Sequence, residues 1–248
     1  QRVIAGAICP SGYSNACLDG LHSQDGQSAA HGWKPMGGWR FGNTIDGTQA
    51  EYVRVPDAMA NLAPVPDELT DEQVLMCPDI MSTGFGGAES GNIRIGDMVA
   101  IFAQGPIGLC ATAGARLLGA SRIIAVDRVP ERLDMARRLG AHHTVDFSTV
   151  DPVAAVMDLT DGRGVDVAIE ALGLQSTFEA CLRVLRPGGT LSSLGVYSAD
   201  LSIPLDALVA GLGDHTITTT LCPGGSERMR RLMSVIASGQ VDLGAMVT

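Results

Sequence analysis

The sequence lacks the features of a nucleic-acid-binding or membrane-spanning protein. Lys and Arg total 17 against 27 Asp and Glu, which gives a net charge of −10. The basic residues mostly stand singly, and we interpret the one dense run, Arg228 to Arg231 after Glu227, as a helix face. Because nucleic-acid phosphates require clustered positive charge, that class of partner is excluded. No apolar stretch approaches the roughly 20 residues that a membrane span requires.

The sequence also shows no pattern typical of a disulfide framework or of a signal peptide. The six cysteines lack regular, tight spacing, so reduced thiols and a cytoplasmic location are expected. The residues that follow Gln1 show neither a charged segment nor an apolar core, so we expect no signal peptide in them. Residues 1–5 resemble the inside of a strand, and the sequence ends at Thr248 without an obvious end of a domain. We therefore expect a fragment of a longer chain.

What is present divides into two regions. Residues 1 to about 65 are rich in Gly, Ser and Asn, with short β-like runs such as Ala50–Val55. From about residue 80, apolar strands alternate with helices, which predicts an α/β fold with a doubly wound parallel sheet of the Rossmann type. The expected strands are 99–102, 123–126, 143–147, 165–169, 190–194 and 215–221. The expected helices are 107–118, 130–139, 151–159, 176–185, 205–212 and 226–238, with a turn at 186–189.

The segment from Ala103 to Gly108 matches a dinucleotide-binding turn, with Ala103 in place of the first glycine. Gly105 would let the backbone approach a pyrophosphate, and Gly108 would let the helix pack closely on the strand. Pro106 and Ile107 begin the helix whose N-terminus attracts the anion. The alternative is an ordinary tight turn between strand and helix.

Asp127 ends the next expected strand, where an acid hydrogen-bonds the hydroxyls of the adenosine ribose. Its charge would repel a 2′-phosphate, which favours NAD over NADP. The neighbouring Arg128 keeps NADP open, because an arginine there can accept that phosphate. We therefore predict NAD as the cofactor, with both residues at its ribose.

Two later glycine turns follow expected strands. They contain Ala171, Leu172 and Gly173 in one turn and Gly195, Val196 and Tyr197 in the other. Open α/β sheets bind ligands at the carboxyl ends of their strands, so both turns are candidates for contact with the nicotinamide and its ribose. Simple turn geometry explains them equally well.

The segment from Cys77 to Glu89 resembles the zinc-dependent medium-chain alcohol dehydrogenases, and it looks closest to the microbial tetrameric secondary-alcohol (isopropanol-type) branch. Residues 38–43, 47–55 and 221–225 are similar to that branch as well. The resemblance implies a partial, mainly β GroES-like catalytic domain over 1–80, an NAD-binding Rossmann domain over 81–225, and a helix returning towards the catalytic domain over 226–248.

The resemblance also places Asp79 as one ligand of a catalytic zinc, a role that a carboxylate can fill. A helix cap is the alternative for Asp79, and Cys77 is a weaker candidate ligand. The other ligands of the family, an early Cys and a His beside a Glu, are not in this sequence, so weak or no zinc binding is expected. Only Cys9 and Cys17 fall where relatives carry a four-cysteine structural zinc, so none is expected.

The family chemistry is hydride transfer between a zinc-bound secondary alcohol, or its ketone, and NAD. The resemblance places Thr83 near the nicotinamide and Trp39 in an apolar substrate pocket, although Trp39 is equally consistent with a surface aromatic. It also implies a tetramer, and the β-branched edge segment 215–220 is suited to pairing between subunits. The alternatives are a zinc-free quinone or enone reductase of the same superfamily and a non-catalytic NAD-binding fragment.

Overall fold

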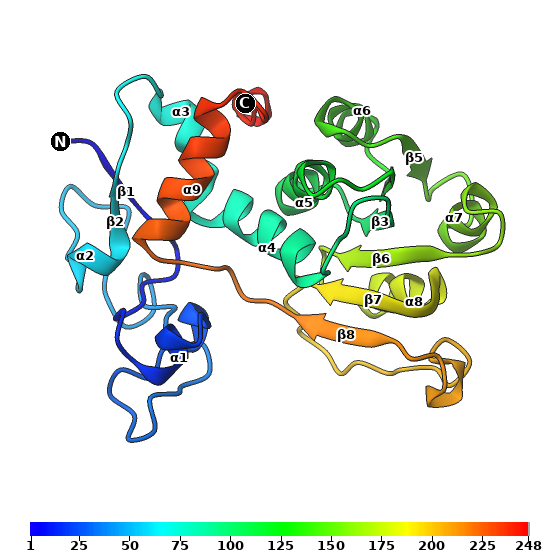
Figure 1. The fold of residues 1–248 in the computed structure, drawn as a ribbon, viewed down its shortest axis with the longest axis horizontal. Coiled ribbons are helices and arrows are strands. Elements are labelled where there is room, and N and C mark those ends of the chain that lie inside the picture. The colour runs from blue at the N-terminus through cyan, green and yellow to red at the C-terminus, as the bar shows by residue number, and fades with distance from the viewer. Residues whose placement is uncertain (248) are drawn as a thin grey trace. The chain divides into compact units, whose positions relative to one another are not determined.

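The computed structural model describes residues 1–247, which divide into two compact units (Figure 1). One unit comprises residues 1–82 together with the chain from residue 221 onward, and the other comprises residues 83–220. The predicted domain boundaries at residues 80 and 225 stay a prediction, and the final residue of the last predicted segment, Thr248, lies outside the described residues. No helix within residues 1–247 is both long and apolar enough to cross a membrane.

The unit of residues 83–220 is built on a parallel sheet. Within this unit the sheet has six strands in the order β5-β4-β3-β6-β7-β8, and all neighbouring pairs are parallel. The strands are β3 (Met98–Phe102), β4 (Arg122–Asp127), β5 (His143–Asp146), β6 (Val165–Glu170), β7 (Leu185–Ser193) and β8 (Thr216–Thr219). The predicted α/β Rossmann architecture is confirmed by this order.

Helices cover both faces of the sheet. The chain steps one way from β3 to β5 and the other way from β6 to β8, and right-handed crossovers then place the connecting helices on opposite faces. Accordingly α5 contacts α6, and α7 contacts α8. The central strands β3, β4 and β6 are almost wholly buried, as their apolar sequences predict. The helices are α4 (Ser82–Ser90), α5 (Pro106–Leu117), α6 (Pro130–Leu139), α7 (Pro152–Leu159) and α8 (Gln175–Arg183).

Two local predictions in this unit are wrong. Residues 205–212 form turns and a single 3-10 turn, η3 (Val209–Gly211), instead of a helix. Leu205 and Leu212 remain exposed, and a short helix without a buried apolar face has little to stabilise it. The predicted turn at 186–189 lies inside β7, which has a register irregularity there opposite β6. Gly188 has a φ of 72°, a conformation that suits glycine in a bulge.

The other unit contains short elements around a small core. Its strands β1 (Val3–Ala5) and β2 (Leu62–Pro64) pair antiparallel, and the predicted strand at Ala50–Val55 is wrong because those residues are irregular. The buried face of α9 includes Met229, Leu232 and Met233. The remaining elements are α1 (Asn15–Leu18), η1 (His22–Gln24), α2 (Ala58–Asn61), α3 (Asp71–Val74), the π-helix η2 (Cys77–Met81), α9 (Ser226–Ala237) and η4 (Gly244–Met246).

Candidate functional site

The sheet has one topological switch point, between its neighbouring strands β3 and β6. The chain leaves β3 towards β4 and leaves β6 towards β7, so the turns after these two strands diverge. Open α/β sheets bind ligands in the crevice that forms outside the carboxyl ends at such a point. The predicted dinucleotide turn follows β3, and the turn at 171–173 follows β6, so the structure brings these two predicted segments to one edge of the sheet.

The glycines of the first turn have different surroundings. A methyl group added at Gly108 would lie 1.9 Å from the carbonyl oxygen of Ala103, so only glycine lets α5 pack this closely on β3. A methyl group added at Gly105 would meet nothing within 4 Å. Ala103, which replaces the first glycine of the motif, has a φ of 73°. The backbone at Gly108 is therefore packed tightly against β3, whereas there is free space beside Gly105. Gly105 lies directly before the N-terminus of α5 at Pro106 and Ile107.

Asp127 ends β4 and is buried, with 4% of its surface exposed. Its Oδ2 accepts the N–H of Gln104 at 2.6 Å, and its Oδ1 accepts the N–H groups of Arg128 at 2.7 Å and Val129 at 3.0 Å. The carboxylate thus ties the turn after β3 to the turn after β4, a role that the sequence analysis missed. Carboxylate oxygens offer about four lone-pair sites, so capacity for a hydroxyl donor remains.

Glu170 is a buried acid that the sequence analysis also missed. It ends β6, as Asp127 ends β4, and its exposed fraction is 0%. The signal that could have found it is this position, an acid at the end of an apolar strand directly before a glycine turn. Its Oε1 accepts the N–H groups of Leu172 at 3.0 Å and Gly173 at 2.8 Å.

The two later glycine turns lie against each other. A methyl group added at Gly173 would be 2.5 Å from the carbonyl oxygen of Val196, and one added at Gly195 would be 2.4 Å from the Cα of Gly173. Leu172 and Val196 are 52% and 86% exposed. Burial raises the pKa of Tyr197, so its hydroxyl stays protonated and can donate a hydrogen bond. The turns together form a continuous backbone surface with two projecting apolar side chains.

The predicted catalytic residues fall in both units. Asp79 is exposed on the π-helix η2, and π-helical turns are frequent at functional sites. Trp39 lines an apolar cavity of about 530 Å³ within the unit of residues 1–82, together with side chains such as Phe41 and Val53. Thr83 belongs to the sheet unit, where it is buried in α4.

A complete zinc site does not fit the residues that the structure describes. Between residues 1 and 247 no group of three or more His, Cys, Asp or Glu side chains could hold a metal ion. Burial raises the pKa of the Cys77 thiol to about 12, and its Sγ lies 3.8 Å from Sδ of Met81. Burial likewise raises the pKa of Cys9 to about 11. Asp79 stays the predicted ligand, and we assign no chemical step to a metal.

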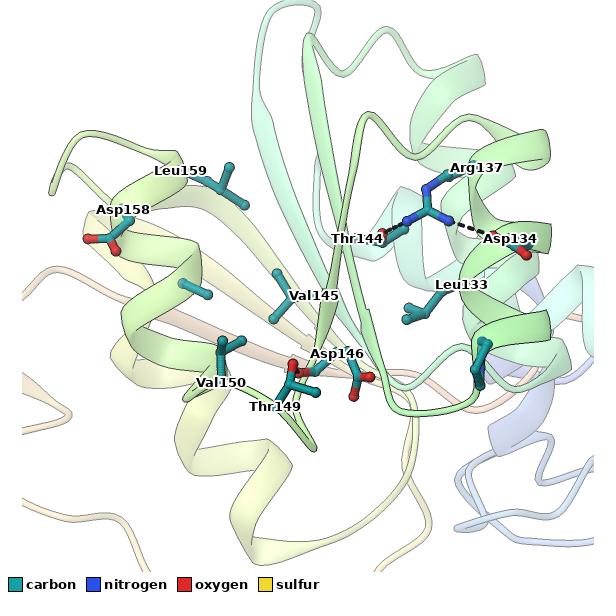
Figure 2. Close-up of a pocket in the computed structure, with 12 residues that line it drawn as sticks. Leu133, Asp134, Arg137, Thr144, Val145, Asp146, Thr149, Val150, Asp158 and Leu159 are labelled. Carbon is teal, nitrogen blue, oxygen red and sulfur yellow. Dashed lines mark hydrogen bonds and ion pairs between the residues drawn. The ribbon is translucent and has the colours of Figure 1, made fainter.

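A cavity of about 620 Å³ lies over the edge strand β5, between α6 and α7 (Figure 2). Its floor includes Leu133 and Val145, and three aspartates stand around it. Its arginine, Arg137, already pairs with Asp134 at 2.5 Å and donates a hydrogen bond to Thr144. The excess of carboxylates makes this cavity a poor site for a pyrophosphate, which favours the switch point instead.

Comparisons with known proteins agree with this geometry. The family model described as zinc-binding dehydrogenase matches residues 106–238. An alcohol dehydrogenase of Cupriavidus necator is 69% identical and spans 100% of this chain, which covers 70% of that protein. The NADP-dependent isopropanol dehydrogenase of Thermoanaerobacter brockii is 38% identical, with 100% and 69% of the two chains covered.

Solved structures show the same relationship. The alcohol dehydrogenase TADH from Thermus sp. ATN1 superimposes with a TM-score of 0.84 at 33% identity, over 99% of this chain and 69% of that chain. A zinc-dependent alcohol dehydrogenase 2 from Streptococcus pneumonia gives a TM-score of 0.85 at 32% identity, over 99% and 67%. The family predicted from the segment Cys77–Glu89 is confirmed, and the chain belongs to the zinc-binding dehydrogenases.

Proposed function

We propose that this chain binds NAD and acts in hydride transfer between a secondary alcohol, or its ketone, and the nicotinamide. The observation that carries the proposal is the edge of the sheet at the switch point, where a methyl group on Gly105, directly before α5, would meet nothing within 4 Å and Asp127 ends the next strand. The cofactor supplies the redox chemistry when bound, and the protein positions it. The names of the relatives, alcohol dehydrogenase and isopropanol dehydrogenase, support an alcohol as substrate.

Each turn at this edge of the sheet has a distinct task in this proposal. The N-terminus of α5, from Gly105 to Gly108, holds the pyrophosphate through backbone N–H groups. The turns at 171–173 and 195–197 contact the nicotinamide and its ribose. Thr83 lies near the nicotinamide, and Trp39 forms a wall of the apolar substrate pocket. Asp79 stays a proposed zinc ligand.

The choice of NAD over NADP rests on Asp127. Three backbone N–H groups hold this buried carboxylate in place. It therefore cannot rotate away from a 2′-phosphate, and the two negative charges would repel each other. Isopropanol dehydrogenases similar to this chain are named NADP-dependent, so the proposal distinguishes this chain from those relatives. The exposed side chain of Arg128 offers the competing contact to a phosphate.

A homotetramer is the assembly that we propose, with the edge strand β8 at one subunit contact. β8 is an outer strand of the sheet and consists of Thr216, Ile217, Thr218 and Thr219. Ile217 is 39% exposed, and exposed Leu205 and Leu212 precede the strand. An uncharged, β-branched edge can pair with a second copy of itself. The cytoplasmic location stays a prediction.

Initial rates of the full-length gene product with 2-propanol test the proposal. We expect oxidation with NAD at a higher kcat/KM than with NADP, and loss of activity after treatment with a metal chelator, because the remaining zinc ligands of the family are expected outside residues 1–248. Activity that survives the chelator would favour the zinc-free reductase. Binding of NADH without turnover would favour the non-catalytic alternative, and preference for NADP would overturn the role given to Asp127.

A further inference from the structure

Glu170 connects three separate parts of the sheet unit. Its Oε1 accepts the two backbone N–H groups of the 171–173 turn and, at 2.6 Å, the hydroxyl of Thr177 in α8. Its Oε2 accepts the hydroxyl of Tyr197 at 2.9 Å, and that hydroxyl also lies 2.7 Å from Oγ of Ser193. One carboxyl group therefore fastens both later glycine turns and the helix that follows the first of them.

The carboxyl group is also unusual in its charge environment. Glu170 is 0% exposed, and no Lys, Arg or His of the part of the chain that the structure describes forms an ion pair with it. Burying a carboxyl group without a cation is costly, and here hydrogen bonds from two N–H groups and two hydroxyls offset that cost. Gly195 leaves room for it, because a methyl group there would lie 2.3 Å from Oε2.

We propose that Glu170 is a positioning residue that holds the turns at 171–173 and 195–197 in the arrangement that receives the nicotinamide half of the dinucleotide. The inference rests on the proposed function. It assigns to Glu170 no contact with the cofactor, since its oxygens are occupied by the turns themselves. Asp127 ties the turns at the adenosine half, and Glu170 ties those at the nicotinamide half.

The two halves can be tested separately with two ligands. NADH occupies both halves, whereas ADP lacks the nicotinamide ribose and ring and reports on the adenosine half alone. Dissociation constants for both, measured by fluorescence titration and by calorimetry, are compared for the wild-type chain and the variants Glu170→Ala, Glu170→Gln, Tyr197→Phe and Thr177→Val. Tyr197→Phe removes one hydroxyl, and Thr177→Val changes α8 without changing either turn.

The proposal makes a graded prediction. Glu170→Ala weakens NADH binding about tenfold or more, and Tyr197→Phe and Thr177→Val weaken it about three- to tenfold, while ADP affinity stays within about twofold. Glu170→Gln restores most of the affinity, because its Oε1 still accepts three donors and its amide can donate to Tyr197. Asp166→Asn, at the other end of β6, is the matched control and leaves both affinities unchanged.

Each other outcome has a defined meaning. If Glu170→Ala does not fold, Tyr197→Phe and Thr177→Val carry the test. Equal losses of NADH and ADP affinity in these two variants would overturn the proposal, because they would indicate general loosening of the fold. Unchanged NADH affinity in both would overturn it as well. A wild-type chain that binds neither ligand would instead refute the proposed function, and the positioning role would fall with it.

Discussion

The two ends of strand β6 carry buried acids with opposite kinds of partner. Asp166, near the amino end, pairs with two arginines: its Oδ1 lies 2.7 Å from Arg163 Nη2 and 2.6 Å from Arg186 Nε. Burial raises the pKa of Asp166, but hydrogen bonds from these arginines and from the N–H of Met98 outweigh it and hold the pKa well below its usual value. Glu170, at the carboxyl end, is held by backbone N–H groups and hydroxyls instead.

The difference separates stability from function along one strand. Two ion pairs at the amino end hold the loop at Arg163 and the bulge of β7 at Arg186. Neutral donors at the carboxyl end hold the two glycine turns for which we propose cofactor contact. A parallel sheet brings the carboxyl ends of all its strands to one edge, so ligand-contacting turns gather there. Substitutions at the carboxyl edge should therefore change NADH affinity, whereas substitutions at the amino edge should change stability alone.

The largest effect on stability is expected for Gly108→Ala. The added methyl group would lie 1.9 Å from the carbonyl oxygen of Ala103, so α5 must move away from β3. We expect the free energy of unfolding to fall by about 3 kcal/mol, measured by urea denaturation. This change at the carboxyl edge should also reduce NADH affinity. Wild-type stability in this variant would mean that the close packing of helix and strand is not required.

Asp166→Asn should show a smaller loss that is confined to stability. We expect about 1 to 2 kcal/mol at pH 7, because both arginines keep contact with water and screening weakens the pairs. Since the folded-state pKa lies below the unfolded value, the ionised Asp166 stabilises the fold above about pH 4 and loses that contribution as the pH falls through the lowered pKa.

The difference between wild type and Asp166→Asn should accordingly shrink as the pH is lowered below about 4. Denaturant midpoints at a series of pH values give this profile. A difference that grows on acidification would contradict the account, as would a change in NADH affinity at neutral pH. Either result would break the distinction between the two edges.

Gly105→Ala should have the smallest effect on stability and yet a clear effect on binding. Gly105 has a φ of −65°, which alanine adopts readily, and its added methyl group meets nothing within 4 Å. Unfolding free energy should stay unchanged or rise by up to about 1 kcal/mol. NADH affinity should fall at least tenfold, because the methyl group enters the space proposed for the pyrophosphate. Unchanged affinity would place the cofactor elsewhere.

The sequence predicted those features that depend on local chemistry. The apolar runs of β3, β4 and β6 predicted buried parallel strands, which the structure contains. Gly105 and Gly108 predicted a tight turn between a strand and a helix, and Asp127 predicted the end of the next strand. The predicted helix at 205–212 is wrong because apolar residues such as Leu205 and Leu212 stay exposed and have no surface to pack against. Spacing along the chain cannot tell whether such a surface exists.

The hydrogen bonds of Glu170 could not be predicted from the sequence, for a related reason. Its hydroxyl partners Thr177 and Tyr197 come from two separate later segments, and only the folded sheet brings these hydroxyls to one carboxyl group. Asp127 was found because a known motif names an acid at its position. The hydrogen bonds that Asp127 accepts from backbone N–H groups could not be predicted from the sequence either.

Hydrogen exchange of the backbone amides, with and without saturating NADH, tests most directly whether the carboxyl edge is the binding edge. The account predicts slower exchange on NADH addition in residues 104–108, 171–173 and 195–197. It predicts no change in the amino-edge segments 162–164 and 186–189. Slower exchange around the cavity over β5 (Figure 2), or at the amino edge, would contradict the claim that the carboxyl edge binds the cofactor.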